Sequence, residues 1–139
     1  GYGDKEIIAE LPSRIASSKI LFVGLRNWER KEIIVRQKQY GIPHLAPKDV
    51  AQNSDAVKCW LKTCGASKVL IHFDMDVLDP SEIVAAVGTD PEGMKMEEVI
   101  RVINDIAVEK EIVGLTIAEP MPRTAIRIKD MLNRLPLLK

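Results

Sequence analysis

Three apolar segments along the chain have the length and composition of short strands. They are "KILFVGLR" (Lys19–Arg26), "KVLIHFDMD" (Lys68–Asp76) and "EIVGLTIAEP" (Glu111–Pro120). Each run is short and is closed by glycine, proline or charged residues, which favours a buried strand. The pattern therefore predicts three strands that are apolar on both faces.

The segments between these strands carry a helical repeat. Residues 29–41 have a helical pattern that stops at Gly41, and Asn53 or Ser54 can cap a second helix. Apolar residues at the i, i+3, i+4, i+7 spacing give that helix one buried face, formed by Val57, Trp60, Leu61 and Cys64. A later helix carries the longest stripe, formed by Met96, Val99, Ile100, Ile103, Ile106 and Ala107. Residues 123–135 predict a closing helix.

Strands that alternate with helices predict an α/β fold, with a parallel sheet between two helical layers in a three-layer α-β-α arrangement. A length of 139 residues fits a single domain, 1–139. Ligands of such sheets bind beyond the carboxyl ends of the strands. Asp74 and Asp76 end the second predicted strand, and Glu119 ends the third. The fold therefore predicts that these carboxylates meet at one edge of the sheet.

The overall charge and the cysteines narrow the classes of partner and compartment. Lys+Arg and Asp+Glu both number 20 and aromatic residues make up 4%, which favours neither nucleic acid nor an acidic membrane as a partner. No apolar run reaches the roughly 18 residues of a membrane span, and no signal-peptide pattern opens the chain. We interpret Cys59 and Cys64 as free thiols. We therefore expect a cytoplasmic protein.

The stretch "HFDMDVLDPS" concentrates three aspartates within six residues. Because side chains alternate along a strand, His72, Asp74 and Asp76 are predicted to project from one face. Two neighbouring carboxylates repel each other unless a cation or proton lies between them, and Mg²⁺ or Mn²⁺ accepts carboxylate oxygens readily. The alternative is structural, with the aspartates capping a turn or helix. For Asp79, which precedes Pro80, a turn or cap is the favoured interpretation.

An apolar strand that ends in Asp-x-Asp resembles the haloacid-dehalogenase-like phosphatases. That resemblance implies that the first aspartate is a nucleophile and the second an acid/base. The family pattern also has a later Ser or Thr, a Lys and a second acidic pair, and no convincing "GDxxxD" or "DD" follows Asp79. The phosphatase interpretation stays a minor alternative.

A closer resemblance involves "FDMDVLDP", which is similar to the D-x-D-x-x-D-P signature of the arginase, agmatinase and formimidoylglutamase superfamily (ureohydrolases). The flanks "FVGLR", "AVGTDPEGM" and "GLTIAEPMP" resemble segments of the same family in the same order. The likeness extends from about Leu21 to Pro122. It implies a Mn²⁺-dependent hydrolase that cleaves a C–N bond of a small guanidino or amidino compound through a metal-bridging hydroxide.

The resemblance also assigns roles to individual residues. Asp74 is similar to the carboxylate that bridges two Mn²⁺ ions, and Asp76 to a second ligand from the same strand. Glu119 is similar to the glutamate that accepts the substrate guanidinium, and Thr89 is expected to line the substrate loop. Asp90 stands ahead of Pro91, where the sequence departs from the family pattern.

The remaining ligands of that family are absent from this sequence. They come from a G-G-D-H-type turn and a D-x-H-x-D motif, whereas the histidines here are His44, expected in a loop, and His72. His72 is either a ligand or a hydrogen-bonded neighbour of the site. We expect the carboxy-terminal half of an arginase-like domain that is inactive alone. The alternative is a non-catalytic metal-binding or oligomerisation fragment. The family often forms trimers or hexamers, so the resemblance also makes a homo-oligomer possible, although the sequence does not give the oligomeric state.

Overall fold

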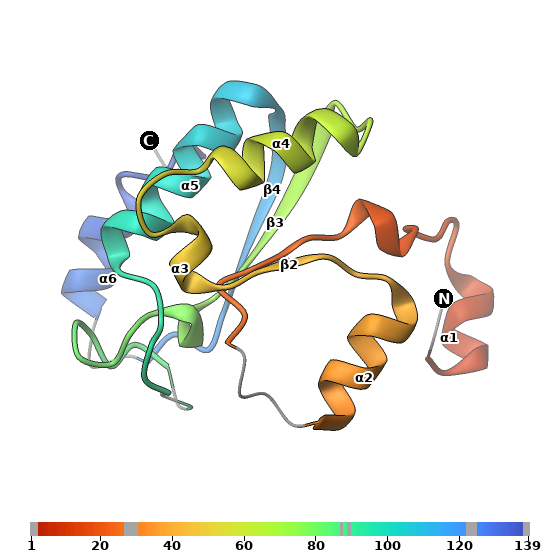
Figure 1. The fold of residues 1–139 in the computed structure, drawn as a ribbon, viewed down its shortest axis with the longest axis horizontal. Coiled ribbons are helices and arrows are strands. Elements are labelled where there is room, and N and C mark those ends of the chain that lie inside the picture. Colours follow the sequence, from red (N-terminus) through yellow and green to blue (C-terminus); the bar gives the residue numbers. More distant parts are fainter. Residues whose placement is uncertain (1–2, 27–30, 87, 89, 122–124, 138–139) are drawn as a thin grey trace.

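The computed structural model describes residues 3–26, 31–86, 88, 90–121 and 125–137 (Figure 1). Its α-helices are α1 (Lys5–Glu10), α2 (Lys31–Tyr40), α3 (Pro47–Val50), α4 (Asp55–Thr63), α5 (Met96–Glu109) and α6 (Ala125–Leu132). Its strands are β1 (Phe22–Val23), β2 (His44–Leu45), β3 (Lys68–Asp74) and β4 (Glu111–Ala118). Two 3₁₀ helices, η1 (Ser17–Lys19) and η2 (Met75–Val77), complete the described elements.

All strand pairing among the described residues is parallel, which confirms the predicted α/β class. β1 pairs with β2, and β3 pairs with β4 along its length, from Lys68↔Glu111 to Asp74↔Ala118. The described strands form two separate two-stranded sheets, where we expected one sheet of three strands. His44, expected in a loop, lies in the two-residue strand β2. Such a short pairing carries too few residues to produce a recognisable strand pattern.

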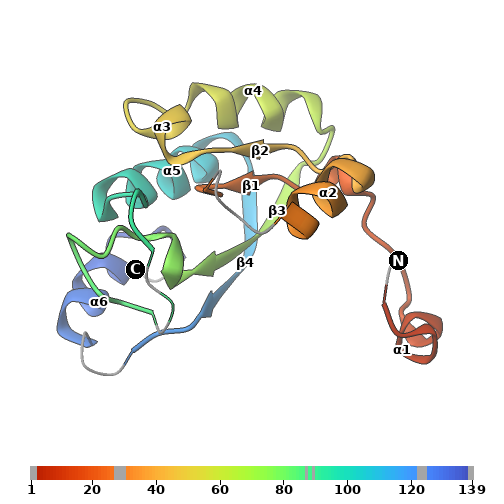
Figure 2. The same cartoon turned by 60° about the horizontal axis from the view of Figure 1, so that its bottom comes forward.

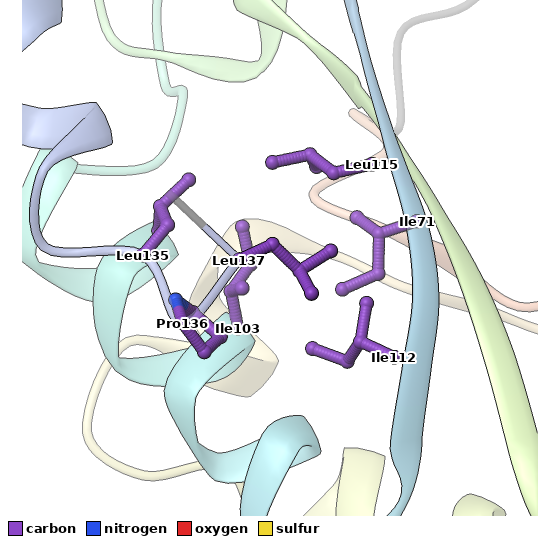
Figure 3. A pocket seen from close by; sticks show the side chains of 7 residues that line it. All are labelled: Ile71, Ile103, Ile112, Leu115, Leu135, Pro136 and Leu137. Carbon is purple, nitrogen blue, oxygen red and sulfur yellow. The ribbon is translucent and has the colours of Figure 1, made fainter. Parts of the chain in front are cut away.

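The inner face of the β3–β4 pair holds the core. Phe73 of β3 is 4% exposed, and it belongs to the same buried cluster as Leu61 of α4 and Ile103 of α5. Figure 3 shows side chains from both strands converging on α5 and the C-terminal segment, namely Ile71, Ile112, Leu115, Ile103, Leu135, Pro136 and Leu137. The predicted apolar stripe of α5 therefore packs against this face, with Val99, Ile100 and Ile103 buried; Val102, outside the predicted stripe, is buried as well.

The outer face of the β3–β4 pair is open to solvent, contrary to the expected cover on both sides. Leu70 is 64% exposed and Val113 is 54% exposed. On the same face, His72 Nδ1 lies 2.8 Å from Thr116 Oγ1, so the exposed imidazole is hydrogen-bonded across the two strands. The apolar sequence of these strands indicates two buried faces, whereas the described part of the chain buries one.

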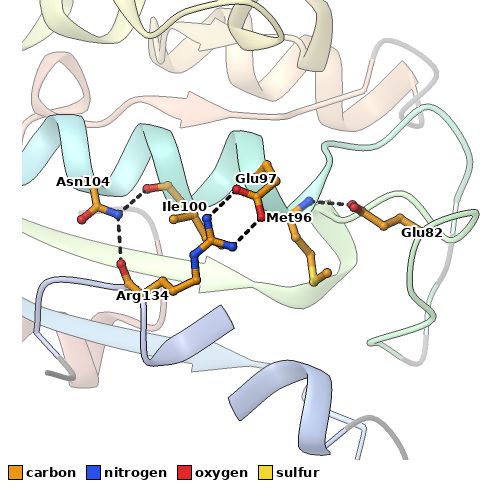
Figure 4. A network of polar contacts seen from close by, with 6 residues as sticks. All are labelled: Glu82, Met96, Glu97, Ile100, Asn104 and Arg134. Atoms are coloured by element: carbon orange, nitrogen blue, oxygen red, sulfur yellow. Dashed lines mark hydrogen bonds and ion pairs between the residues drawn. The ribbon is translucent and has the colours of Figure 1, made fainter. Parts of the chain in front are cut away.

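Polar contacts fasten the C-terminal segment and the loop after β3 to α5 (Figure 4). The Arg134 guanidinium donates to both carboxylate oxygens of Glu97, and Asn104 Nδ2 donates to the Arg134 carbonyl oxygen at 3.0 Å. Glu82 Oε2 accepts from the Met96 amide at 2.6 Å, at the first turn of α5. These contacts fix the start of α5 relative to the loop that precedes it.

The N-terminal helix α1 stands away from the rest of the chain (Figure 2). It has no buried residue, and Asp4 caps it by accepting from the Glu6 amide at 2.9 Å and the Ile7 amide at 3.2 Å. Across the described residues, no helix has both the length and the apolar character that a membrane crossing requires.

Candidate metal and substrate site at the ends of β3 and β4

The carboxyl ends of β3 and β4 lie at the same edge of their sheet (Figure 2). Asp74 is opposite Ala118 in the parallel register, and Glu119 follows Ala118 directly. Adjacent strands are about 4.8 Å apart, so these strand ends are neighbours in space. Asp74 is half-buried and Glu119 is exposed. The sheet therefore brings together the two strand ends for which the sequence predicted ligand-binding carboxylates.

Glu119 has an unusual backbone conformation for a residue with a side chain. Its φ is +57°, in the left-handed region that costs a non-glycine residue of the order of 1–3 kcal/mol. Such conformations persist where the surrounding structure requires them, and they concentrate at functional sites. The turn of the chain at Glu119 therefore supports a role for this residue beyond joining β4 to the next segment.

The prediction that Asp74 and Asp76 project from one strand face is wrong. β3 ends at Asp74, and residues Met75–Val77 form η2, closed by the Leu78 amide donating to the Met75 carbonyl at 3.2 Å. Asp74 caps this turn, since its Oδ1 accepts from the Asp76 amide at 3.3 Å. Strand alternation stops where the backbone leaves the extended conformation. The exposed Asp76 side chain therefore takes its direction from a 3₁₀ turn.

Asp79 closes the loop that follows the strand end, as the turn interpretation predicted. Its Oδ1 accepts from the Ser81 amide at 2.8 Å and from the Ser81 hydroxyl, and its Oδ2 accepts from the Gly93 amide at 2.9 Å. The Ser81 hydroxyl is the first cause that holds the pKa of Asp79 below its ordinary value of 3.8, followed by the Ser81 amide; the Gly93 and Glu92 amides lower it further. Thr89, the expected substrate-loop residue, lies outside the described residues.

Arg26 is a buried cation at this site that the sequence did not single out. It follows β1 and is 9% exposed. Its Nη2 donates to the carbonyl oxygens of Asp76 at 2.9 Å and Asp90 at 3.0 Å, and its Nε donates to that of Pro91 at 3.1 Å. In the sequence, the arginine of "FVGLR" only ends an apolar run. Its partners could not be predicted, because every residue has a backbone carbonyl.

The carboxylate ligands at the strand end suit a hard divalent cation, but there are too few of them to complete a metal site. Asp74 and Asp76 offer carboxylate oxygens, which Mn²⁺ and Mg²⁺ prefer. Within the part of the chain that the structure describes, no group of three or more His, Cys, Asp or Glu side chains could hold a metal ion. His44 Nδ1 lies 2.8 Å from Gln37 Nε2 and His72 pairs with Thr116, so each described histidine has a hydrogen-bonding neighbour.

Comparisons with known proteins give this arrangement a family. The family model described as "Arginase family" matches residues 7–132. The arginase of Eremothecium gossypii is 26% identical over 123 residues, which are 85% of this chain and 31% of that protein. The chain therefore belongs to the arginase family. This membership sets aside the phosphatase interpretation.

Solved structures of similar fold agree. The chain resembles Entamoeba histolytica arginase in complex with L-ornithine, with a TM-score of 0.82 and 20% identity over 97% of this chain and 48% of that one. Helicobacter pylori arginase has a TM-score of 0.74 at 14% identity, over 86% and 44%. For the formimidoylglutamase of Bacillus subtilis the values are 0.69 and 20%, over 77% and 35%. The fold is thus arginase-like and incomplete, since the chain spans about a third to a half of these relatives.

Proposed function

We propose that this chain supplies one side of the active site of a Mn²⁺-dependent hydrolase that cleaves a C–N bond of a small guanidino or amidino compound. The observation that carries the proposal is the β3–β4 register, which brings Asp74 and Glu119 to one sheet edge. Membership of the arginase family supports the reaction class. In this proposal residues 1–139 are the carboxy-terminal part of one catalytic domain that works in the cytoplasm.

Asp74 and Asp76 would hold manganese. The half-buried Asp74 carboxylate accepts a hydrogen bond from the Asp76 backbone amide. This bond fixes the orientation of the carboxylate at the end of β3. Two bound Mn²⁺ ions would supply a water-derived nucleophile at neutral pH. The protein's own contribution is the rigid strand that carries Asp74 and the turn η2 that carries Asp76.

Glu119 would bind the cationic end of the substrate. A carboxylate can accept two parallel hydrogen bonds from a planar guanidinium, which fixes the orientation of the cation as well as its position. The left-handed backbone at Glu119 turns the chain sharply just after β4. Thr89, which lies in the sequence between Asp79 and Gly93, would line the substrate loop.

We further propose that the chain alone does not turn over substrate, because Asp74 and Asp76 are too few ligands for two metal ions. A non-catalytic metal-binding or oligomerising role is the second candidate. The exposed Leu70 and Val113 favour it, since apolar side chains on a strand face are normally covered. Homo-oligomer formation would provide such a cover.

A turnover assay separates these statements. The purified chain with Mn²⁺ is incubated with L-arginine, agmatine and N-formimidoyl-L-glutamate, and the release of urea or formamide is followed. We expect no product. Turnover by the chain alone would contradict the proposal that it carries only one side of the active site. Titration with agmatine is then expected to shift the Glu119 amide resonance in wild type but not in Glu119→Gln. Glu111→Gln, at the other end of β4, is the matched control and should leave the shift intact.

A further inference from the structure

We infer that Arg26 is a positioning residue for the proposed site. Its guanidinium fixes the carboxylate-bearing turn after β3 and the loop segment Asp90–Gly93 in one relative arrangement. The inference rests on the proposed function, because it assigns the placement of Asp76 and of the segment Asp90–Gly93 to a third segment. It concerns a residue outside the motif "FDMDVLDP".

The contacts of Arg26 join segments that are far apart in the chain. Besides the carbonyl oxygens of Asp76, Asp90 and Pro91, Nη2 lies 3.3 Å from that of Leu78. Two of these acceptors belong to the segment after β3 and two to the turn before Gly93. A guanidinium has five N–H donors in a rigid plane and accepts nothing, so several backbone carbonyls are suitable partners for it.

The close approach of the backbones around Arg26 shows that this arrangement is tight. A Cβ atom at Gly93 would lie 2.5 Å from Arg26 Nη2 and 2.6 Å from the Asp79 amide nitrogen. A Cβ atom at Gly24, whose φ is +85°, would lie 2.3 Å from Val77 Cγ2. Side chains do not fit at either glycine without movement of their neighbours. The segments around β1, η2 and Gly93 therefore have little room to shift independently.

Backbone hydrogen bonds complete the connection between the two segments that Arg26 holds. The Asp79 amide donates to the Met94 carbonyl and the Met94 amide donates to the Val77 carbonyl, both at 2.8 Å. Together with the Gly93 amide bound to Asp79, these bonds provide amide protons that report on the loop. If Arg26 positions the loop, replacing Arg26 should speed the hydrogen exchange of these amide protons before that of other amides.

The two proposed metal carboxylates depend on Arg26 to different degrees. Asp74 belongs to β3 and is held by the ladder to β4, whereas Asp76 lies on a 3₁₀ turn and its own carbonyl oxygen accepts from Arg26. Loss of the guanidinium should therefore disturb the position of Asp76 while Asp74 stays in place. A lysine has a single ammonium group and can satisfy only part of the fork geometry.

The experiment compares Arg26→Gln and Arg26→Lys with Arg101→Gln. Arg101 is the matched control, because its guanidinium also donates to backbone carbonyls, those of Val50 and Ala51, away from the site. Amide hydrogen exchange is followed by NMR for Gly93 and Met94 and for the strand residue Phe73. For Arg26→Gln we expect exchange at least tenfold faster at Gly93 and Met94 and less than twofold faster at Phe73. Arg26→Lys should be intermediate, and Arg101→Gln should match wild type at these three amides.

A second measurement separates positioning from general stabilisation. Mn²⁺ binding is measured from the loss of the free-ion electron paramagnetic resonance signal, and Arg26→Gln is expected to weaken it at least threefold. Unchanged Gly93 and Met94 exchange, equally accelerated exchange at all three amides, or unchanged Mn²⁺ affinity would overturn the inference. If Arg26→Gln does not fold, Arg26→Lys decides by the same criteria. If wild type binds no Mn²⁺, the proposed metal role fails, and the exchange data alone decide whether Arg26 positions the loop.

Discussion

The two faces of the β3–β4 pair both carry apolar side chains but have different surroundings, and the outer face also carries the His72–Thr116 pair. On the inner face Phe73 is 4% exposed and packs in the cluster with α5, whereas Leu70 on the outer face is 64% exposed. Apolar residues on both faces are typical of parallel strands covered on both sides. The apolar pattern of the sequence therefore indicates which faces these strands could bury. The described part of the chain covers only one of the two faces.

The carboxyl end of the same pair is held in a different way. There hydrogen bonds from Arg26 and to Asp79 add to the apolar packing of Met75, Leu78 and Met94. Apolar packing does not depend on the protonation of a side chain, whereas the Asp79 contacts do. The inner face, the outer face and the strand end should therefore respond differently to substitution and to pH.

The largest expected effect separates the two faces. Phe73→Ala removes a fully packed aromatic ring and should lower the free energy of unfolding by about 3–5 kcal/mol. Leu70→Thr places a β-branched residue, which suits a strand, on the exposed face and should change the free energy of unfolding by no more than about 0.5 kcal/mol. Urea denaturation at 25 °C measures both. If Leu70→Thr lowers the free energy of unfolding strongly, and by an amount that depends on protein concentration, another copy of the chain covers the outer face in solution.

A smaller effect is expected at the strand end. Asp79→Asn removes the charge that the Ser81 and Gly93 groups stabilise, and should cost about 1 kcal/mol at neutral pH, since asparagine keeps one acceptor oxygen. Because folding lowers the pKa of Asp79 below 3.8, its stabilising contribution is present above that pH and is lost as the pH falls through the folded value.

The stability difference between wild type and Asp79→Asn should therefore shrink toward zero in acid below pH 3.8. Denaturation curves at a series of pH values measure this difference. Asp130→Asn, on the exposed side of α6, controls for the removal of one negative charge at neutral pH and should stay within about 0.5 kcal/mol. A difference for Asp79→Asn that stays constant down to pH 2 would contradict the role of the carboxylate.

The parallel-sheet rule correctly brought the ends of the strands that carry Asp74 and Glu119 together. That rule depends only on strand order and direction, which apolar runs reveal well. The same reasoning failed for Asp76, because alternation holds only while the backbone stays extended, and the switch to η2 after Asp74 has no strong signal. The roles of Asp74, Asp76, Glu119 and Thr89 stay predictions.

Other features depend on contacts that sequence patterns do not encode. Arg26 acts on backbone carbonyls 50 to 65 residues away, and a carbonyl is present at every position of the chain. The strand β2 has two residues, too few for any alternation to be visible. The exposure of Leu70 depends on which segments lie over the sheet. The longer strands β3 and β4, the helices α2, α4, α5 and α6 and the family were therefore predictable, whereas the short elements and the contacts that position the candidate site were not.

The most direct test of the account is where Mn²⁺ binds. In ¹H–¹⁵N spectra, small amounts of Mn²⁺ broaden amides close to the ion. We expect the first losses at Asp74, Asp76 and Glu119, with little broadening in Asp74→Asn and unchanged broadening in the control Asp105→Asn. Broadening that is centred elsewhere, or that persists in Asp74→Asn, would contradict the assignment of this strand end as one side of a metal site.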